Sequence, residues 1–323
     1  MNDIAQLKKE NSLLRIDEFK KKLCQIDELK ELENLSVFVS GSYAREEASE
    51  YSDIDLFFVL EGDLNELELP NIKSMRAFSK IIEASDSLGF PTFSNDGEFL
   101  KILEKKRILE ELGGKNDDHL NFFTARMLML LESKPVYGSI SYNRVLMEII
   151  EAYFRDYKHH PENFNPTFLV NDILRFWKTL CLNYEHKRNK RDDKKAIKQK
   201  IKNLKLKFSR MLTCFGSIVA IIDHEKNVEP GVLIDLAAKT PRARLTDVVG
   251  RYPCLKHHMD TINTEYSWFL QLTNIPEDEL IEAFKDQGVK SDAFKRADKF
   301  GSAMFNIVKY IAEERGYLRY LLI

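Results

Sequence analysis

The fold is decided by residues 37–59, which read VFVSGSYAREEASEYSDIDLFFV. The run up to Ser40 is apolar and predicts a short strand that breaks at Gly41-Ser42 into the polar start of a helix. The run from Asp53 is rich in aromatic and aliphatic residues and predicts a second strand. Because residues i and i+2 of a strand share one face, we expect the side chains of Asp53 and Asp55 to point the same way.

The two aspartates predict a cation site. Neighbouring carboxylates repel each other and are costly to desolvate unless a cation lies between them. A hard divalent ion such as Mg²⁺ takes oxygen ligands of this kind and also binds substrate phosphates. Gly41 allows the backbone to approach a phosphate closely, and free N–H groups at a helix start attract anions. A surface turn beside an acidic strand end is the plainer interpretation, but the order strand, turn, helix, strand argues against it.

This arrangement resembles the signature of the DNA polymerase β-type nucleotidyltransferase superfamily: a Gly-Ser turn, about ten residues, then Asp-hydrophobic-Asp at a strand start. The motif covers only the first third of the chain. The resemblance implies an α+β fold, in which a small mixed-sheet core is followed by an all-helical C-terminal domain. It also implies transfer of a nucleoside monophosphate from an NTP to a hydroxyl. Two Mg²⁺ ions (or Mn²⁺) would bind to Asp53 and Asp55, and Gly41, Ser42 and Arg45 would bind the nucleotide.

The superfamily usually places a third carboxylate on a strand beside the Asp-x-Asp pair. The resemblance implies Asp96 as this catalytic and metal-binding residue, with Glu98 as the reserve. Asp96 lies in a predicted Asn-Asp-Gly turn, so a turn-forming aspartate is the competing interpretation. Residues 133–138, SKPVYG, are similar to the segment after the catalytic domain in the PII-protein uridylyltransferase branch. A helix ending in a Pro-Gly turn is the alternative there.

Composition sets broad limits on the protein. A chain of 323 residues is long for one core and suggests two domains. Its net charge of −2 gives no global field for nucleic acid or membrane, so a nucleic-acid site would have to be a local patch. The four cysteines show no metal-binding spacing, and reduced thiols in the cytoplasm are the simplest account. The longest apolar run, 211–222, is too short to span a bilayer, so we expect no membrane partner.

Periodicity places the remaining elements. Helical spacing marks 3–33, 71–85, 98–115 and 118–134, and a third strand is expected within 89–98. Beyond about residue 141 every periodic stretch is helical: 141–157, 166–186, 193–223, 230–250, 255–272, 276–286 and 291–314. We therefore expect a nucleotidyltransferase domain at 1–138 and a helical bundle at 139–323 that binds nucleotide and acceptor.

Two features of the helical half carry possible chemistry. The resemblance implies a basic residue that reaches the triphosphate, and Lys178, with Arg175 behind it, is the candidate. Charges extending from a half-buried helix are the alternative. Residues 187–210 are dominated by lysine and arginine. Such a run is usually a solvated face, although it could also bind RNA phosphates or the nucleotide itself.

The acceptor is left open by the sequence. A protein side chain, a tRNA end, a small molecule such as an antibiotic, and a second nucleotide in cyclic-oligonucleotide signal synthesis all occur in the superfamily. Many stand-alone members are toxins or phage-defence proteins, so a toxin–antitoxin role is one expectation. The alternative from another class is a catalytically degenerate NTP-binding or interaction protein, and the intact Asp53 and Asp55 argue against it.

Overall fold

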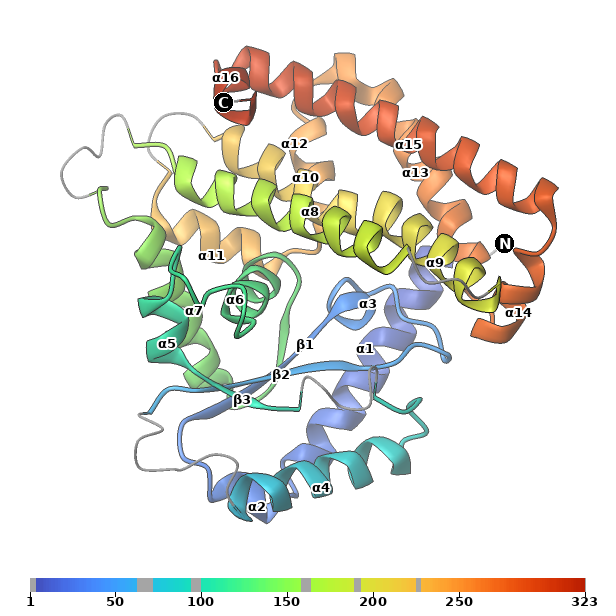
Figure 1. Cartoon of the computed structure of the whole chain (residues 1–323). Coiled ribbons are helices and arrows are strands. Elements are labelled where there is room, and N and C mark those ends of the chain that lie inside the picture. Colours follow the sequence, from blue (N-terminus) through green and yellow to red (C-terminus); the bar gives the residue numbers. More distant parts are fainter. Residues whose placement is uncertain are drawn as a thin grey trace. The chain divides into compact units, whose positions relative to one another are not determined.

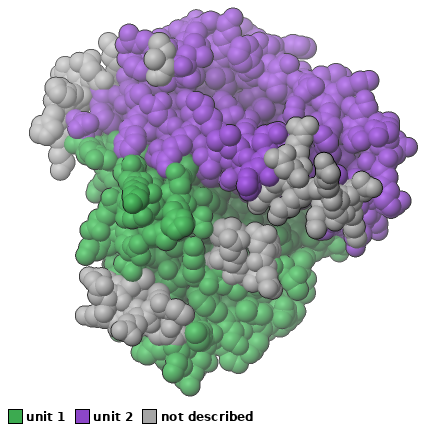
Figure 2. Space-filling view, in the orientation of Figure 1, with its two compact units in different colours: residues 1–155 green, residues 156–323 purple. Residues whose placement is uncertain are grey.

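The computed structural model describes residues 4–62, 72–93, 100–157, 164–188, 193–224 and 228–322. The chain forms two compact units, Met1–Arg155 and Asp156–Ile323, which Figure 2 distinguishes by colour. Unit 1 combines a small sheet with helices, and the described part of unit 2 is helical. The predicted α+β class, with a mixed sheet followed by a helical C-terminal part, is confirmed.

A four-stranded mixed sheet forms the centre of unit 1 (Figure 1). Its order is β3-β2-β1-β4, with β1 at Leu35–Ser40, β2 at Asp55–Leu60, β3 at Ile102–Glu104 and β4 at Lys134–Tyr137. Strand β1 pairs antiparallel with β2 and with β4, whereas β2 and β3 run parallel. Every residue of β1 is buried, because this strand has a neighbour on each edge and helices on each face.

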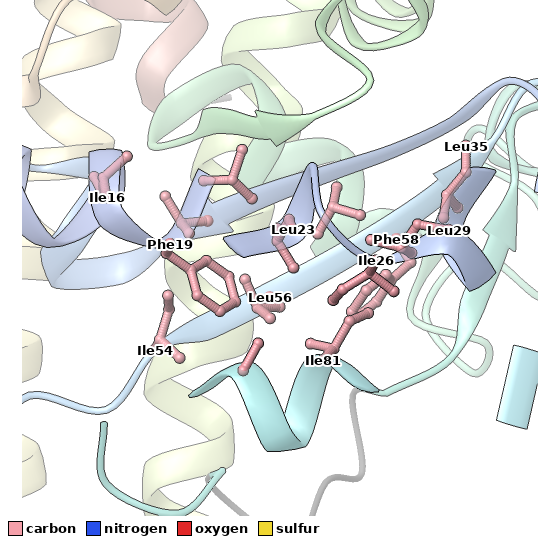
Figure 3. Close-up of a cluster of buried hydrophobic side chains, with 14 of the residues drawn as sticks. Ile16, Phe19, Leu23, Ile26, Leu29, Leu35, Ile54, Leu56, Phe58 and Ile81 are labelled. Atoms are coloured by element: carbon pink, nitrogen blue, oxygen red, sulfur yellow. The ribbon is translucent and has the colours of Figure 1, made fainter. Parts of the chain in front are cut away.

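One face of the sheet is covered by α1 (Ile4–Leu23), α2 (Asp27–Lys30) and α4 (Ile72–Ser87). Side chains at alternate positions along the second strand, Ile54, Leu56 and Phe58, point into this layer. Figure 3 shows them among side chains of the covering helices such as Phe19 and Ile81. Each fully buried apolar side chain of this size stabilises the fold by about 1.5–3 kcal/mol, so this layer holds β2 firmly in place.

The opposite face of the sheet carries α5 (Lys105–Glu110), α6 (Phe122–Leu131) and α7 (Ser139–Tyr153). Phe38 stacks on Phe57 with ring centroids 5.4 Å apart, and Tyr142 of α7 meets Phe38 edge-on at 5.9 Å. Because α7 packs on β1 and β4, the compact unit continues through Arg155, whereas the sequence places the boundary after residue 138.

Three local predictions in unit 1 differ from the structure. The helix expected after the Gly-Ser turn ends at Ala44, and residues 45–52 form a loop. Of the stretch 89–98, where a third strand was expected, residues 90–93 belong to no strand and residues 94–98 lie outside the described ranges; β3 lies at 102–104, where a helix was expected. Strand β4 follows directly on α6, where the sequence predicts only a turn. Both missed strands are only three or four residues long, so their pairing partners define them and periodicity cannot.

Unit 2 is built around the apolar helix α10 (Met211–Ile222), which packs against α8, α12 and α15. A π-helical stretch at Leu206–Arg210 joins α9 to α10, and Pro253–Leu255 forms a 3₁₀ turn before α13. The other helices are α8 (Thr167–Arg188), α9 (Asp193–Lys205), α11 (Pro230–Ala238), α12 (Pro241–Val249), α13 (Lys256–Leu272), α14 (Glu277–Ala283), α15 (Gln287–Glu314) and α16 (Leu318–Leu322). None of the helices in the described ranges is long and apolar enough to cross a membrane.

Candidate active site

The turn after β1 is built on a glycine that no other residue replaces easily. Gly41 adopts φ +67°, in the left-handed region that glycine occupies without steric cost. A Cβ at this position would lie 2.7 Å from Oδ2 of Asp55, which is too close for a non-bonded carbon. The backbone of the turn and the Asp55 carboxylate are therefore in direct contact. The short helix α3 (Gly41–Ala44) begins here and closes with the Arg45 amide donating to the Gly41 carbonyl at 3.1 Å.

The two aspartates lie where β2 begins. Asp55 is the first residue of the strand and pairs in register with Ser40, the last residue of β1. Both aspartates are half-buried, whereas Ile54 and Leu56 are buried in the core between the sheet and α1. Asp55 thus lies on the face that also holds Phe57, opposite the apolar layer. Asp53 lies two residues before the strand begins and has no partner in the β1–β2 ladder. Its position is therefore set by the loop to which it belongs and by the residues that contact this loop.

Tyr43, in the turn itself, is a feature that sequence reasoning missed. Its side chain is fully buried, and its hydroxyl has no hydrogen-bond partner among the described residues. Burial raises the pKa of Tyr43 to about 12; the Arg15 cation opposes the shift and the Asp53 carboxylate adds to it. The hydroxyl is therefore neutral across the physiological range and lies within reach of the Asp53 charge.

Arg45 is held in a buried ion-pair network. Its Nε donates to Oε2 of Glu47 at 2.7 Å, and its Nη1 donates to Oε2 of Glu132 at 2.9 Å. Glu132 follows α6, so this network ties the loop after the Gly-Ser turn to the α6–β4 connection. Lys134 of β4 makes a further ion pair with Glu46 of the same loop. The nucleotide-binding role of Arg45 stays a prediction, and the contacts shown here are structural.

Glu132 could have been noticed in the sequence as a carboxylate that directly follows the largely apolar helix α6, of whose ten residues nine are buried.

Asp96 and Glu98 lie outside the described residues, and their role stays a prediction. Strand β3 runs parallel to β2, with Ile102 beside Phe58. The chain therefore enters β3 from the end of the sheet at which Asp55 lies.

The basic candidates belong to unit 2. Lys178 is exposed on α8, and Arg175, one turn earlier, donates to Asp172 at 3.4 Å. Within the basic segment, Lys198 pairs with Glu277 at 3.2 Å and Lys207 pairs with Asp298 at 2.9 Å. Lys202 and Lys205 are exposed on α9. The side chains of 187–195 are outside the described set, so the segment is characterised only from Ala196 onward.

The donor set fits a hard divalent cation. Asp53 and Asp55 supply carboxylate oxygens, the ligand type that Mg²⁺ and Mn²⁺ prefer. The Asp55 carboxylate occupies the space that a side chain at position 41 would need, so the glycine lets this carboxylate lie against the backbone of the turn. Across the described ranges no group of three acidic, histidine or cysteine side chains gathers to hold a metal, and the two candidates for a third carboxylate lie beyond those ranges.

Comparison with known proteins agrees with this geometry. Residues 16–130 match the family model described as "Nucleotidyltransferase domain". The matched segment contains the Gly-Ser turn, both aspartates, and strands β1, β2 and β3. It confirms the resemblance to the polymerase β-type superfamily, whose members generally use divalent metals. No curated protein matches the chain significantly.

Proposed function

We propose, on the premise that residues 16–130 form a nucleotidyltransferase domain, that this protein moves a nucleoside monophosphate from an NTP to an acceptor hydroxyl with the help of Mg²⁺. The contact between Gly41 and the Asp55 carboxylate carries the proposal. It joins a phosphate-binding type of turn to a metal-binding type of carboxylate, and neither a surface turn nor a core strand end needs such a contact.

Asp53 and Asp55 would hold two Mg²⁺ ions, for which Mn²⁺ could substitute. Bound there, the metal neutralises charge on the phosphates and on the attacking and leaving oxygens. The acceptor oxygen forms a bond to the α-phosphorus, and the bond from that phosphorus to the oxygen bridging toward the β-phosphate breaks. Pyrophosphate leaves with the electron pair, and the hydroxyl proton passes to solvent. The aspartates would thus hold and orient the cations without forming a covalent bond to the nucleotide.

Other residues would bind the triphosphate. The backbone N–H groups at Gly41 and Ser42, with the Ser42 hydroxyl, would bind the β- and γ-phosphates. Arg45, whose guanidinium is paired with Glu47 and Glu132, would contribute to nucleotide binding by holding that turn in place. Lys178 of unit 2 would contact the triphosphate.

The third carboxylate would be Asp96 or Glu98. Because the chain enters β3 from the end of the sheet that carries Asp55, either residue precedes Ile102 by few enough positions to contribute. Replacement by the neutral amide distinguishes them. Of the variants Asp96→Asn and Glu98→Gln, the one that removes the metal-binding carboxylate should lose transfer, and the other should keep it. Activity in both single variants and in the double variant would remove the third carboxylate from the mechanism.

The acceptor class is decided by one assay. The purified chain is incubated with Mg²⁺ and each α-labelled NTP, alone, with bulk tRNA, or with a bacterial lysate. Label in RNA would support the basic segment 187–210 as an acceptor site, and label in a protein band would support a protein acceptor. A small labelled product formed from NTP alone would indicate an oligonucleotide synthase, and one formed only in lysate a small-molecule acceptor. If no label moves under any condition, the protein is instead a degenerate NTP-binding protein.

A further inference from the structure

Loop 45–52, which links the glycine turn to the first aspartate, is held by side chains of α1. Asn11 donates from Nδ2 to the carbonyl oxygen of Ala48 at 3.1 Å. The Ala48 amide donates to Oγ of Ser12 at 2.9 Å. Ser12 is fully buried, and its hydroxyl donates to the Lys8 carbonyl at 2.7 Å. The Ser12 hydroxyl therefore donates its proton within α1, and its oxygen is available to accept a hydrogen bond from the loop.

Arg15 makes the next contact along the same helix. Its Nη1 donates to the carbonyl oxygen of Glu50 at 3.3 Å, and its Nη2 donates to the carbonyl oxygen of Leu88 at 3.2 Å. The guanidinium carbon lies 4.2 Å from the ring centroid of Phe90. One side chain therefore joins the loop before Asp53 to the turn that follows α4, and it uses the planar fork that lysine lacks.

The contacts of Phe90 lead on to the catalytic turn. Its ring meets Tyr43 edge-on at 5.5 Å and Phe19 of α1 at 5.6 Å. Tyr43 follows Ser42 directly, and its buried hydroxyl interacts electrostatically with both Arg15 and Asp53. The glycine turn, loop 45–52 and the residues after α4 thus share one support, which is the segment of α1 from Asn11 to Phe19.

We propose that α1 is a positioning element for catalysis, in which Asn11, Ser12 and Arg15 fix loop 45–52 and thereby set where Asp53 stands relative to the Gly41-Ser42 turn. This inference rests on the proposed function, since it assigns the support of that same site. The three residues precede residue 16, where the match to the nucleotidyltransferase family begins. They lie in the part of α1 that precedes the matched segment.

Asp53 has particular need of such support. Asp55 is fixed by the β1–β2 ladder, but Asp53 lies outside that ladder, at the end of the loop. Within the loop, the Ser49 amide donates to Oγ of Ser52 at 3.0 Å. The contacts from α1 at Ala48 and Glu50 hold the half of the loop nearer Asp53, whereas the ion pairs of Arg45 and Glu46 hold the half nearer the glycine turn. Loss of residues that orient metal ligands typically costs about 10–100-fold in metal affinity or activity.

The test compares Arg15→Ala with a matched arginine variant. Arg144 donates from Nε to Glu61 at 2.9 Å and from Nη2 to Asn34 at 3.4 Å. It thus links Asn34, just before β1, to Glu61, just after β2, at the ends of these strands remote from Asp55. We expect Arg15→Ala to lower kcat about 10–100-fold and to raise the Mg²⁺ concentration for half-maximal rate about tenfold, with KM for NTP little changed. Arg144→Ala should leave all three near the wild-type values.

Three further measurements separate positioning from folding. Arg15→Lys keeps the charge but supplies no planar fork, so it should recover only part of the rate. Hydrogen exchange at the Ala48 amide should speed up in Arg15→Ala and in Asn11→Ala, while the unfolding midpoint of each stays within a few degrees of wild type. Mn²⁺ binding, followed by electron paramagnetic resonance, should weaken in both variants and stay unchanged in Arg144→Ala.

The outcomes that overturn the inference differ from those that overturn the function. An active wild-type protein with equally active Arg15→Ala and Asn11→Ala variants, unchanged in Mg²⁺ dependence, contradicts the positioning role alone. Equal losses in Arg15→Ala and Arg144→Ala also contradict it, because general destabilisation would then explain both. A wild-type protein that neither transfers label nor binds Mn²⁺ overturns the proposed function, and the positioning role with it.

Discussion

At the scale of single residues, the proposed site depends on a backbone position that strongly favours glycine. Gly41 has φ +67°, and a Cβ there would meet Oδ2 of Asp55 at 2.7 Å. Two separate penalties follow: backbone strain of about 1–2 kcal/mol and displacement of the carboxylate. The second penalty affects function more than stability. The Asp55 side chain can move away from the added Cβ, but its carboxylate then loses the orientation proposed for metal binding.

Gly41→Ala should therefore lower NMP transfer at least about 100-fold while reducing the free energy of unfolding by only about 1–2 kcal/mol. Label transfer and urea unfolding measure the two effects. Gly316→Ala is the matched control, because Gly316 has φ +64° and open space around its missing Cβ. It should show the strain without the loss of transfer. Full activity in Gly41→Ala would contradict the close contact with Asp55.

The residue scale also shows what a sequence can reveal about a site. The roles of Gly41, Ser42, Asp53 and Asp55 stay predictions, but the positions of Gly41 at a turn and of Asp55 at a strand start could be expected because local spacing along two strands encodes them. Glu132 and the support from α1 were not, because their partners lie far along the chain, as between Arg45 and Glu132. Buried ion pairs of this kind leave no periodic pattern in the sequence.

At the scale of elements, helix α6 carries a buried charge that fastens it to the chain before and after it. Arg126 and Asp117 are both fully buried, and the guanidinium donates to the two carboxylate oxygens at 2.9 and 2.7 Å. Arg126 also donates to the Tyr153 hydroxyl of α7 at 2.9 Å and to the Ile108 carbonyl of α5 at 3.1 Å. Four segments of unit 1 thus meet at one side chain.

Asp117→Asn should lower the free energy of unfolding by about 3–5 kcal/mol, because it leaves the Arg126 charge buried without its counter-ion. Urea or thermal unfolding followed by circular dichroism measures the loss. Asp17→Asn removes an exposed ion pair with Lys21 on α1 and should change stability by less than about 1 kcal/mol. A loss below 1 kcal/mol in Asp117→Asn would show that this pair does not hold α6 in place.

Unit 2 has a comparable junction, where three helices end together. The buried Asp223 carboxylate after α10 accepts from Arg251, which follows α12, at 3.0 Å. It also accepts from Arg315, which follows α15, at 3.2 Å. Beside it, burial and the Arg251 charge lower the pKa of His224 below its usual value, against the opposing effect of Asp223.

The lowered pKa of His224 sets a direction for the pH dependence of stability. Near and below its ordinary pKa the unfolded chain binds the imidazole proton more readily than the folded chain, so stability is retained above about pH 6.5 and lost as the pH falls below it. His224→Gln should weaken this loss when urea unfolding at pH 7.5 and pH 5.5 is compared. The exposed His257 provides the control, and His257→Gln should behave as wild type. An unchanged pH dependence in His224→Gln would assign the effect to other groups.

Element prediction succeeded where periodicity extends over several turns and failed where pairing decides. The amphipathic helices of both units follow from apolar spacing, and the predicted 193–223 helix is continuous apart from the π-helical stretch at Leu206–Arg210. Strands β3 and β4 are too short to show alternation, and they exist because β2 and β1 offer free edges. The helix expected after the Gly-Ser turn is only four residues long, because the chain leaves the helical path after Ala44 and α1 holds the loop that follows.

At the scale of the whole molecule, the residues proposed to bind metal and phosphate are concentrated in unit 1. The glycine turn, both aspartates and the supporting helix α1 all lie within Met1–Arg155. Helix α7 belongs to this unit because Tyr142 packs on Phe38 and shares a hydrogen bond with Ser133 at 2.6 Å. Composition suggested two domains but could not show that the helix after β4 completes the first. Unit 2 contributes the exposed Lys178 and the basic helix α9 as candidates for binding nucleotide or acceptor.

The most direct test of the account is transfer of label from an α-labelled NTP by the Asp53→Asn and Asp55→Asn variants in the presence of Mg²⁺. Each change removes one metal-binding charge with almost no change in shape, so the fold and unfolding midpoint should persist. The account predicts at least about a 100-fold loss of transfer in each and wild-type transfer in Asp17→Asn. Transfer at the wild-type rate by either Asp53→Asn or Asp55→Asn would contradict the assignment of these carboxylates as the metal-binding centre.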